Sequence, residues 1–440
     1  MLKDRIKYIK DAITNSNIGN RIATGAFWSF TGTAAAKFVA LVSSIICAHI
    51  LTKQEYGEFG MVRSTISMFV VFGTAGLGLT ATKFISEFKE KQKNRIASIY
   101  ILTNGFAIFT GLLVTIIILS IAPFLAESTL KAPQLTPAIR IGALLLFISV
   151  INGAQSGTLS GFEDFKSIAI NTLIGSFAEA LFMLVGAYYW GVLGAVLGYG
   201  VGFVALYLTN WFSIRSNFKK NGIAIRIVDF NKDDLTLLYK FSLPAALCAI
   251  VVTPTMWVVK SILVSSSGFD ELAAFEAADQ WRVLILFIPM AVSQIVLPIL
   301  SSIVGENETK YWRVLKINLL LNASVAFIMA LLISLFSPVI MNLYGKAYVS
   351  DLRILVVLAC STVFTSIANV VGLAISSRSK MWTGFFFNCF WASMVIGFSY
   401  LFIKFGLQAL GIALAFTLAY AIHALLQLLY LKVTTRRKIS

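Results

Sequence analysis

The chain of 440 residues is 58% hydrophobic and only 13% charged. An ordinary soluble domain carries about 25% charged residues, so this composition excludes a soluble globular protein and predicts an integral membrane protein. The formal net charge of +16 would suggest nucleic-acid binding in a soluble chain, but in a membrane protein it reports topology. No nucleic-acid partner is therefore expected.

Twelve apolar segments are long enough to cross a bilayer, which requires about 20 residues. They are Thr24–Leu51, Phe59–Ile85, Ala97–Ile121, Ile139–Gly157, Ser167–Trp190, Gly191–Ile214, Phe241–Val264, Trp281–Ile303, Val314–Phe336, Leu352–Ser376, Trp382–Ile403 and Gly406–Leu431. An all-α integral membrane protein is the fold class that these segments predict, because a helix satisfies its own backbone in lipid.

The distribution of Lys and Arg predicts the orientation of the spans. With the N-terminus inside, most cations fall in inner segments, as the positive-inside rule requires, and both termini are cytoplasmic. The outer loops then hold only four cations: Lys53, Lys131, Lys346 and Lys404. The basic segment 215–240 separates six spans from six, so residues 1–214 and 241–440 are expected to form two lobes joined by a cytoplasmic linker.

Four cations in or beside the spans are candidate binding residues: Lys37, Arg63, Lys260 and Arg282. A charge at the centre of a membrane helix costs about 2.5–3.5 kcal/mol, so such residues usually face a protein interior or a wet cavity. Lys37 and Lys260 are separated by about half the chain, and so are Arg63 and Arg282, which suggests two parallel repeats. For Arg282, near a predicted outer helix end, snorkelling is the alternative.

The carboxylates that could neutralise these cations are few. Glu179, midway through the fifth span, is the only acid expected deep in a span, and a Lys37–Glu179 ion pair would leave Lys260 without an obvious partner. Glu276 and Asp279 are expected just before the eighth span, near Arg282. Because a buried carboxylate can take up and release a proton, Glu179 is also a candidate for ion coupling.

Four of the eight prolines fall in the seventh and eighth predicted spans: Pro244, Pro254, Pro289 and Pro298. A proline removes a helical hydrogen bond and kinks the helix, so this hairpin is a candidate hinge for alternating access. A static bend is the alternative. No metal-ligand spacing, nucleophile elbow or phosphate-binding loop stands out, and neither a metal nor a cofactor is expected.

A cavity that presents Lys37, Arg63 and Lys260 would favour an anion. Phosphate or pyrophosphate suits such a site, because ammonium and guanidinium groups hydrogen-bond its oxygens and offset its desolvation. The alternative is that each cation pairs with a helix-borne carboxylate or a backbone carbonyl.

Several stretches resemble one family of membrane proteins. They are Phe27-Trp28 at the start of the first span, residues 48–59 (AHILTKQEYGEF), Gly76-Leu77-Gly78, and residues 157–165 (GTLSGFEDF). These stretches are similar to those of the polysaccharide-biosynthesis flippases, the O-antigen-type members of the multidrug/oligosaccharidyl-lipid/polysaccharide exporter superfamily. The resemblance covers nearly the whole chain in topology and is strongest in residues 24–86.

The resemblance implies a MATE-like fold with two six-helix lobes around a central cationic cavity. It also implies a flippase of the bacterial cytoplasmic membrane that moves an undecaprenyl-pyrophosphate-linked oligosaccharide to the outer leaflet. The expected partners are this lipid-linked oligosaccharide, bilayer lipid and polysaccharide polymerase machinery. By the same resemblance, Lys37, Arg63 and Lys260 would line the cavity. Val259 departs from the pattern, because many relatives place an acid just before the basic residue of the seventh span.

Two other functions compete with this interpretation. A multidrug cation antiporter of the same superfamily would need acidic groups in its lumen, whereas the deep charges here are mainly basic. A membrane-embedded polysaccharide polymerase or ligase would be expected to carry a large outer loop, and the widest outer loops here are short. One of these is expected at Ser265–Gln280.

Overall fold

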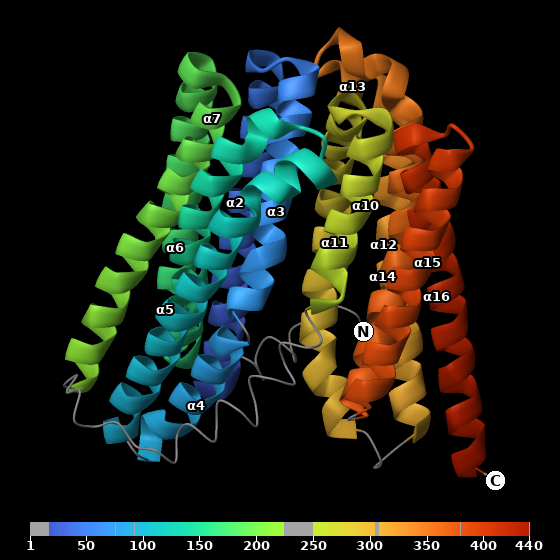
Figure 1. Cartoon of the computed structure of the whole chain (residues 1–440). Coiled ribbons are helices and arrows are strands. Elements are labelled where there is room, and N and C mark those ends of the chain that lie inside the picture. Colours follow the sequence, from blue (N-terminus) through green and yellow to red (C-terminus); the bar gives the residue numbers. More distant parts are fainter. Residues whose placement is uncertain are drawn as a thin grey trace.

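The described part of the protein is built from long α-helices joined by short turns (Figure 1). The computed structural model describes residues 17–74, 76–91, 93–223, 250–303, 308–378 and 380–439. The helices are α2 (Asn17–Ile50), α3 (Lys53–Thr74), α4 (Leu77–Lys91), α5 (Lys93–Phe124), α6 (Thr136–Gly161), α7 (Phe165–Asn221), α10 (Val252–Ser267), α11 (Phe269–Ile303), α12 (Glu308–Leu335), α13 (Ser337–Asn342), α14 (Leu352–Ser377), α15 (Met381–Lys404) and α16 (Gln408–Ile439). Short helical turns, η1 (Leu125–Thr129), η2 (Pro133–Leu135) and η5 (Lys346–Asp351), complete the loops.

The helices account for the twelve predicted spans. Within the described ranges, eight helices are long and apolar enough to cross a membrane, and the bent pair α3–α4 makes a ninth. α7 contains the fifth and sixth spans, because its backbone leaves the helical region at Trp190 and Gly191. α10 and α11 occupy the positions of the seventh and eighth spans, although residues 224–249 lie outside the described part.

The second predicted span is broken. α3 and α4 meet at an angle of 43° around residue 76, where Gly76 has a φ of +72°. Only glycine adopts this left-handed conformation without a steric penalty, so the small-residue run ends one helix and starts another. α3 also begins at Lys53, six residues earlier than the predicted start of the span at Phe59.

α7 folds back on itself as two antiparallel arms. Gly191 has a φ of +56°, and the carbonyl of Gly194 lies so close to Gly186 that a Cβ atom there would clash with it. Further along, Gly198 packs in the same way against the backbone of Phe182. Glycines at four-residue spacing allow two helix backbones to approach this closely in a membrane.

The helices gather into two groups, α2–α7 and α10–α16, which Figure 1 shows in blue to green and in yellow to red. α2 packs on α7 in the first group, and α14 packs on α12 and α16 in the second. The groups meet where α3 contacts α10 and α11 and where α2 contacts α11. This arrangement confirms the expected fold of two helical lobes.

The lobes converge toward the end of the molecule at which α13 lies and diverge toward α4 (Figure 1). At the converging end, His49 Nε2 lies 2.8 Å from the Leu343 carbonyl oxygen, and Lys53 Nζ lies 2.6 Å from Asp351 Oδ2. Lys131 Nζ donates to the carbonyl of Ser265 at 3.1 Å. Side chains of the first lobe are thus bound to loops and to a helix end of the second.

Candidate functional site

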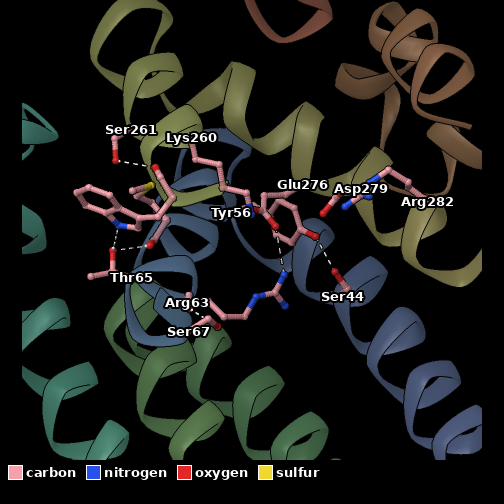
Figure 2. A network of polar contacts seen from close by, with 12 residues as sticks. Ser44, Tyr56, Arg63, Thr65, Ser67, Lys260, Ser261, Glu276, Asp279 and Arg282 are labelled. Carbon is pink, nitrogen blue, oxygen red and sulfur yellow. Dashed lines mark hydrogen bonds and ion pairs between the residues drawn. The ribbon is translucent and has the colours of Figure 1, made fainter. Parts of the chain in front are cut away.

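A buried carboxylate lies between two cations at the contact of the lobes (Figure 2). Lys260 Nζ of α10 donates to Glu276 Oε1 of α11 at 2.6 Å, and Arg63 Nη2 of α3 donates to Glu276 Oε2 at 3.3 Å. Glu276 is 4% exposed and Lys260 is 8% exposed. Because Arg63 belongs to the first lobe and the other two residues to the second, the Glu276 carboxylate connects the lobes.

The early start of α11 places this acid in the site. The segment 269–280, expected as part of an outer loop, is helical, and only the turn at Gly268 separates α10 from α11. Glu276 and Asp279 consequently lie within a helix and beside Lys260. The prediction that Glu179 is the only carboxylate deep in a span is therefore wrong, and Lys260, for which the sequence offers no obvious partner, is paired with Glu276.

Glycines of α3 make room for the Glu276 side chain. Gly57 packs directly against the backbone of Phe269 at the start of α11. One helical turn later, a Cβ atom on Gly60 would lie 2.9 Å from Cγ of Glu276. The absence of side chains at these positions lets α11 approach α3 closely enough for Glu276 to reach Arg63.

Buried hydrogen bonds fix the elements around the ion pairs. The indole Nε1 of Trp257 on α10 donates to Thr65 Oγ1 on α3 at 2.9 Å, which is a second polar link between the lobes (Figure 2). Within the first lobe, the hydroxyls of Ser44 and Tyr56 are 2.6 Å apart. These bonds hold α2, α3 and α10 in a defined register around the carboxylate.

Arg282, six residues beyond Glu276 on α11, forms its own ion pair. Its Nε atom donates to Asp279 Oδ1, and its guanidinium lies 5.5 Å from the ring centroid of Phe416 on α16. The side chain is 11% exposed and lies inside the second lobe, so the snorkelling alternative is wrong. The cluster of Arg63, Lys260, Arg282, Glu276 and Asp279 thus contains three cations against two acids.

A cavity of about 240 Å³ opens beside this cluster. Arg63 and Lys260 line it together with Glu276 and Asp279, and neutral polar groups such as Ser64 and Gln280 complete its wall. The lining comes from α3 of one lobe and from α10 and α11 of the other. The cations, hydroxyls and amide of this lining can bind the oxygens of an anion and the hydroxyls of a sugar.

Lys37 lies apart from this cavity. Its ammonium group on α2 is 6.0 Å from the ring centroid of Phe287 on α11, one helical turn beyond Val283, which lines the cavity. The side chain is partly buried, and no ion pair between Lys37 and a carboxylate is present in the described part of the chain. The alternative of a Lys37–Glu179 pair is therefore wrong.

Glu179 lies on the first arm of α7, where it packs against Gly202 of the second arm. It is partly buried and interacts electrostatically with Arg63. Glu179, in the first lobe, therefore interacts with one of the cations that line the cavity, Arg63. Among the described residues, no group of three His, Cys, Asp or Glu side chains could hold a metal ion.

The four candidate hinge prolines differ in position. Pro254 lies in the first turn of α10, and α11 continues as a single helix through Pro289 and Pro298. The Pro289 side chain is buried. Pro244 lies outside the described residues.

Comparison with known proteins identifies the family. Residues 22–304 match the family model described as polysaccharide biosynthesis protein. The chain belongs to this family. It is 24% identical over 408 residues to an EPS I polysaccharide export inner membrane protein, EpsE, of Ralstonia nicotianae, with 90% of this chain and 91% of the relative covered. It is also 23% identical over 412 residues to a protein of Shigella flexneri named for O-antigen transport, with 92% and 96% covered.

The fold of this family member is MATE-like. A solved structure of a multidrug resistance MATE family transporter of the MOP superfamily, in an inward-facing conformation, superposes with a TM-score of 0.81. The match covers 92% of this chain and 96% of that chain at 17% sequence identity. The twelve-helix, two-lobe architecture expected from the sequence is thereby confirmed.

Sequence reasoning missed Glu276 and Asp279 as members of the site. Four acids interrupt their stretch, 269–280, so the hydropathy pattern places it outside the membrane. Two signals in the sequence could have revealed the helix. The segment 269–280 contains four Ala and two Glu, which favour helices, and Asp279 and Arg282 have the i,i+3 spacing of a helical ion pair.

Proposed function

We propose that this protein is a flippase that moves an undecaprenyl-pyrophosphate-linked oligosaccharide from the cytoplasmic to the outer leaflet by alternating access. The observation that carries this proposal is the polar cavity between the lobes, with Arg63 and Lys260 in its wall. The names of the relatives from Ralstonia and Shigella support a polysaccharide or O-antigen substrate. A transporter fold of two lobes supports the mechanism.

The chemistry of the cavity suits a phosphate-bearing headgroup. A guanidinium donates through a planar fork that matches phosphate oxygens, and an ammonium group adds a compact charge. Arg63 and Lys260 would bind the pyrophosphate, with Lys37 and Arg282 contributing positive potential from nearby. Ser64 and Gln280 would bind the first sugar.

The size of the cavity implies movement. Small-molecule sites usually measure about 300–1,000 Å³, whereas this cavity measures about 240 Å³. It can hold the charged part of the headgroup, but several sugars need a wider opening. The lobes would therefore separate further during transport, with Pro244, Pro254, Pro289 and Pro298 as the proposed hinge positions.

The proposed topology places both termini in the cytoplasm and the α13 end at the outer surface of the bacterial inner membrane. The positive-inside distribution of Lys and Arg supports this orientation. Residues 1–214 and 241–440 would be the two lobes, and residues 215–240 the cytoplasmic linker. Polysaccharide polymerase machinery would receive the product at the outer surface. Glu179 is the candidate for coupling transport to a proton gradient.

Transport of cationic drugs is a weaker proposal for this cavity. An antiporter for cations needs a carboxylate that a positive ligand can reach. Glu276 and Asp279 line the cavity, but Lys260, Arg63 and Arg282 already neutralise them.

Reconstitution into proteoliposomes tests the proposed function. A fluorescent undecaprenyl-pyrophosphate oligosaccharide is incorporated in both leaflets, and a membrane-impermeant quencher reports transfer between them. The proposal predicts transfer that is faster than in protein-free liposomes and no accumulation of a cationic dye. Dye transport without transfer of the lipid would identify an antiporter instead.

A further inference from the structure

We propose that the Arg63–Glu276 ion pair is a latch between the lobes, and that an anionic headgroup opens it by taking Arg63 away from the carboxylate. This inference rests on the proposed function, because it concerns the same cavity. It adds a role for Glu276 as a counter-anion already resident in the site. It also explains how binding of the substrate could start the movement of the lobes.

The two contacts of Glu276 are unequal. Lys260 is held at 2.6 Å and comes from the same lobe, whereas Arg63 is at 3.3 Å and comes from the other lobe. The Arg63 side chain is 25% exposed, compared with 10% for Lys260, and both line the cavity. Arg63 is therefore the cation that a ligand in the cavity can capture, while Lys260 keeps the carboxylate neutralised.

The chemistry of arginine makes this exchange selective for anions. A guanidinium has five N–H donors, and a phosphate accepts two parallel hydrogen bonds from it. The single direct contact from Arg63 Nη2 to Glu276 is a weaker arrangement than such a pair of bonds. A neutral sugar cannot replace the lost ion pair, because it would leave the Arg63 guanidinium without a counter-charge. The latch therefore selects phosphate-linked carriers over neutral glycolipids.

The position of the pair gives the exchange a mechanical consequence. Between described residues, two ion pairs cross the lobe contact: Arg63–Glu276 beside the cavity and Lys53–Asp351 among the loops. Lys53–Asp351 lies among the loops and does not line the cavity, so a ligand in the cavity reaches only the Arg63–Glu276 pair. Release of Arg63 from Glu276 removes a bond that joins α3 to α11, and it would favour separation of the lobes at the α13 end.

Distances between the lobes test the latch. Spin labels are placed at Ser128→Cys in η1 and Ala347→Cys in η5, both exposed, in a protein whose native cysteines are replaced. Inorganic pyrophosphate should increase the long-distance population of the otherwise unmodified protein, and maltotriose, a neutral sugar, should not. Glu276→Gln and Arg63→Gln should each show the long distance without any ligand. Glu308→Gln breaks the Arg378–Glu308 pair inside the second lobe and should behave as the unmodified protein does.

Binding of pyrophosphate, measured by calorimetry, separates the inference from the proposed function. Glu276→Gln should bind pyrophosphate about tenfold more tightly, a difference of about 1.4 kcal/mol, because the competing carboxylate is gone. Binding to the unmodified protein with no change of distance would overturn the latch and leave the proposed function standing. Ligand-free distances of Glu276→Gln and Arg63→Gln that equal those of the unmodified protein would overturn it as well. Absence of pyrophosphate binding in every variant would overturn the anion site itself.

Discussion

Arg63 of α3 and Glu276 of α11 are 213 positions apart in the chain and 3.3 Å apart in space. Their ion pair joins the two lobes at the wall of a polar cavity. Lys260 stabilises the same carboxylate from the second lobe. The lining of the cavity thus balances two cations, Arg63 and Lys260, with two acids, Glu276 and Asp279, and the consequences of this pairing can be measured.

Removal of the Lys260 charge should destabilise the protein. Lys260→Met leaves Glu276 with only the longer contact to Arg63, and loss of one partner of a buried ion pair costs about 3–5 kcal/mol. Thermal unfolding in detergent should show a clearly lower midpoint. The double variant Lys260→Met with Glu276→Gln should recover part of the loss, since no unpaired carboxylate remains. A midpoint unchanged by Lys260→Met would contradict the buried pair.

Removal of the Lys37 charge should have the opposite effect on stability. Lys37 has no ion-pair partner within the described ranges, so Lys37→Met breaks no pair and removes a partly buried charge. The unfolding midpoint should stay equal or rise, while transfer of the pyrophosphate-linked lipid should slow, because the positive potential beside the cavity falls. A strong loss of stability would show that the Lys37 ammonium is neutralised in the folded protein.

A methyl group at Gly60 of α3 should disturb the position of the Glu276 side chain. In Gly60→Ala the new Cβ would lie 2.9 Å from Glu276 Cγ, so either the carboxylate or α3 must move. Overpacking of this kind costs about 1–3 kcal/mol and should weaken the Arg63 contact and transport together. Gly384→Ala on α15 is the matched control, because no heavy atom lies within 4 Å of its Cβ position. Equal behaviour of the two variants would refute the close packing of α3 on α11.

Neutralisation of Glu179 should remove the response to a pH gradient. If this acid carries the coupled proton, Glu179→Gln transfers the labelled lipid at the same rate with and without an imposed gradient. Binding of pyrophosphate should persist, because Glu179 does not line the cavity. The comparison is a transfer assay in proteoliposomes with matched and mismatched internal pH. A gradient response retained by Glu179→Gln would exclude this acid from coupling.

Most of the fold could be predicted from the sequence because lipid imposes a simple rule. Every backbone group in a membrane must be bonded within its own segment, so long apolar runs become helices. The reversal between the fifth and sixth spans was also predictable, since Trp190 and Gly191 interrupt two apolar runs. The break at Gly76 was not, because the residues on both sides remain apolar and only the backbone conformation of one glycine divides them.

The candidate site was harder to predict because its contacts are distant in the sequence. Arg63 and Lys260 were identified as cations that must face the protein interior, and both line the cavity. Their shared partner was missed, because hydropathy alone assigns a stretch that contains Asp270, Glu271 and Glu276 to a loop. A buried carboxylate is tolerated in α11 only because two cations from other helices reach it, and no local pattern reports those partners.

Transfer of the lipid-linked oligosaccharide by Arg63→Gln tests the central claim most directly. The variant is compared in proteoliposomes with Lys404→Gln, which removes an exposed cation at the end of α15. If the cavity between the lobes binds the pyrophosphate, Arg63→Gln loses at least about tenfold in transfer rate, corresponding to about 1.4 kcal/mol, while Lys404→Gln retains the rate of the unmodified protein. Equal rates for Arg63→Gln and the unmodified protein would contradict the assignment of this cavity as the route of the headgroup.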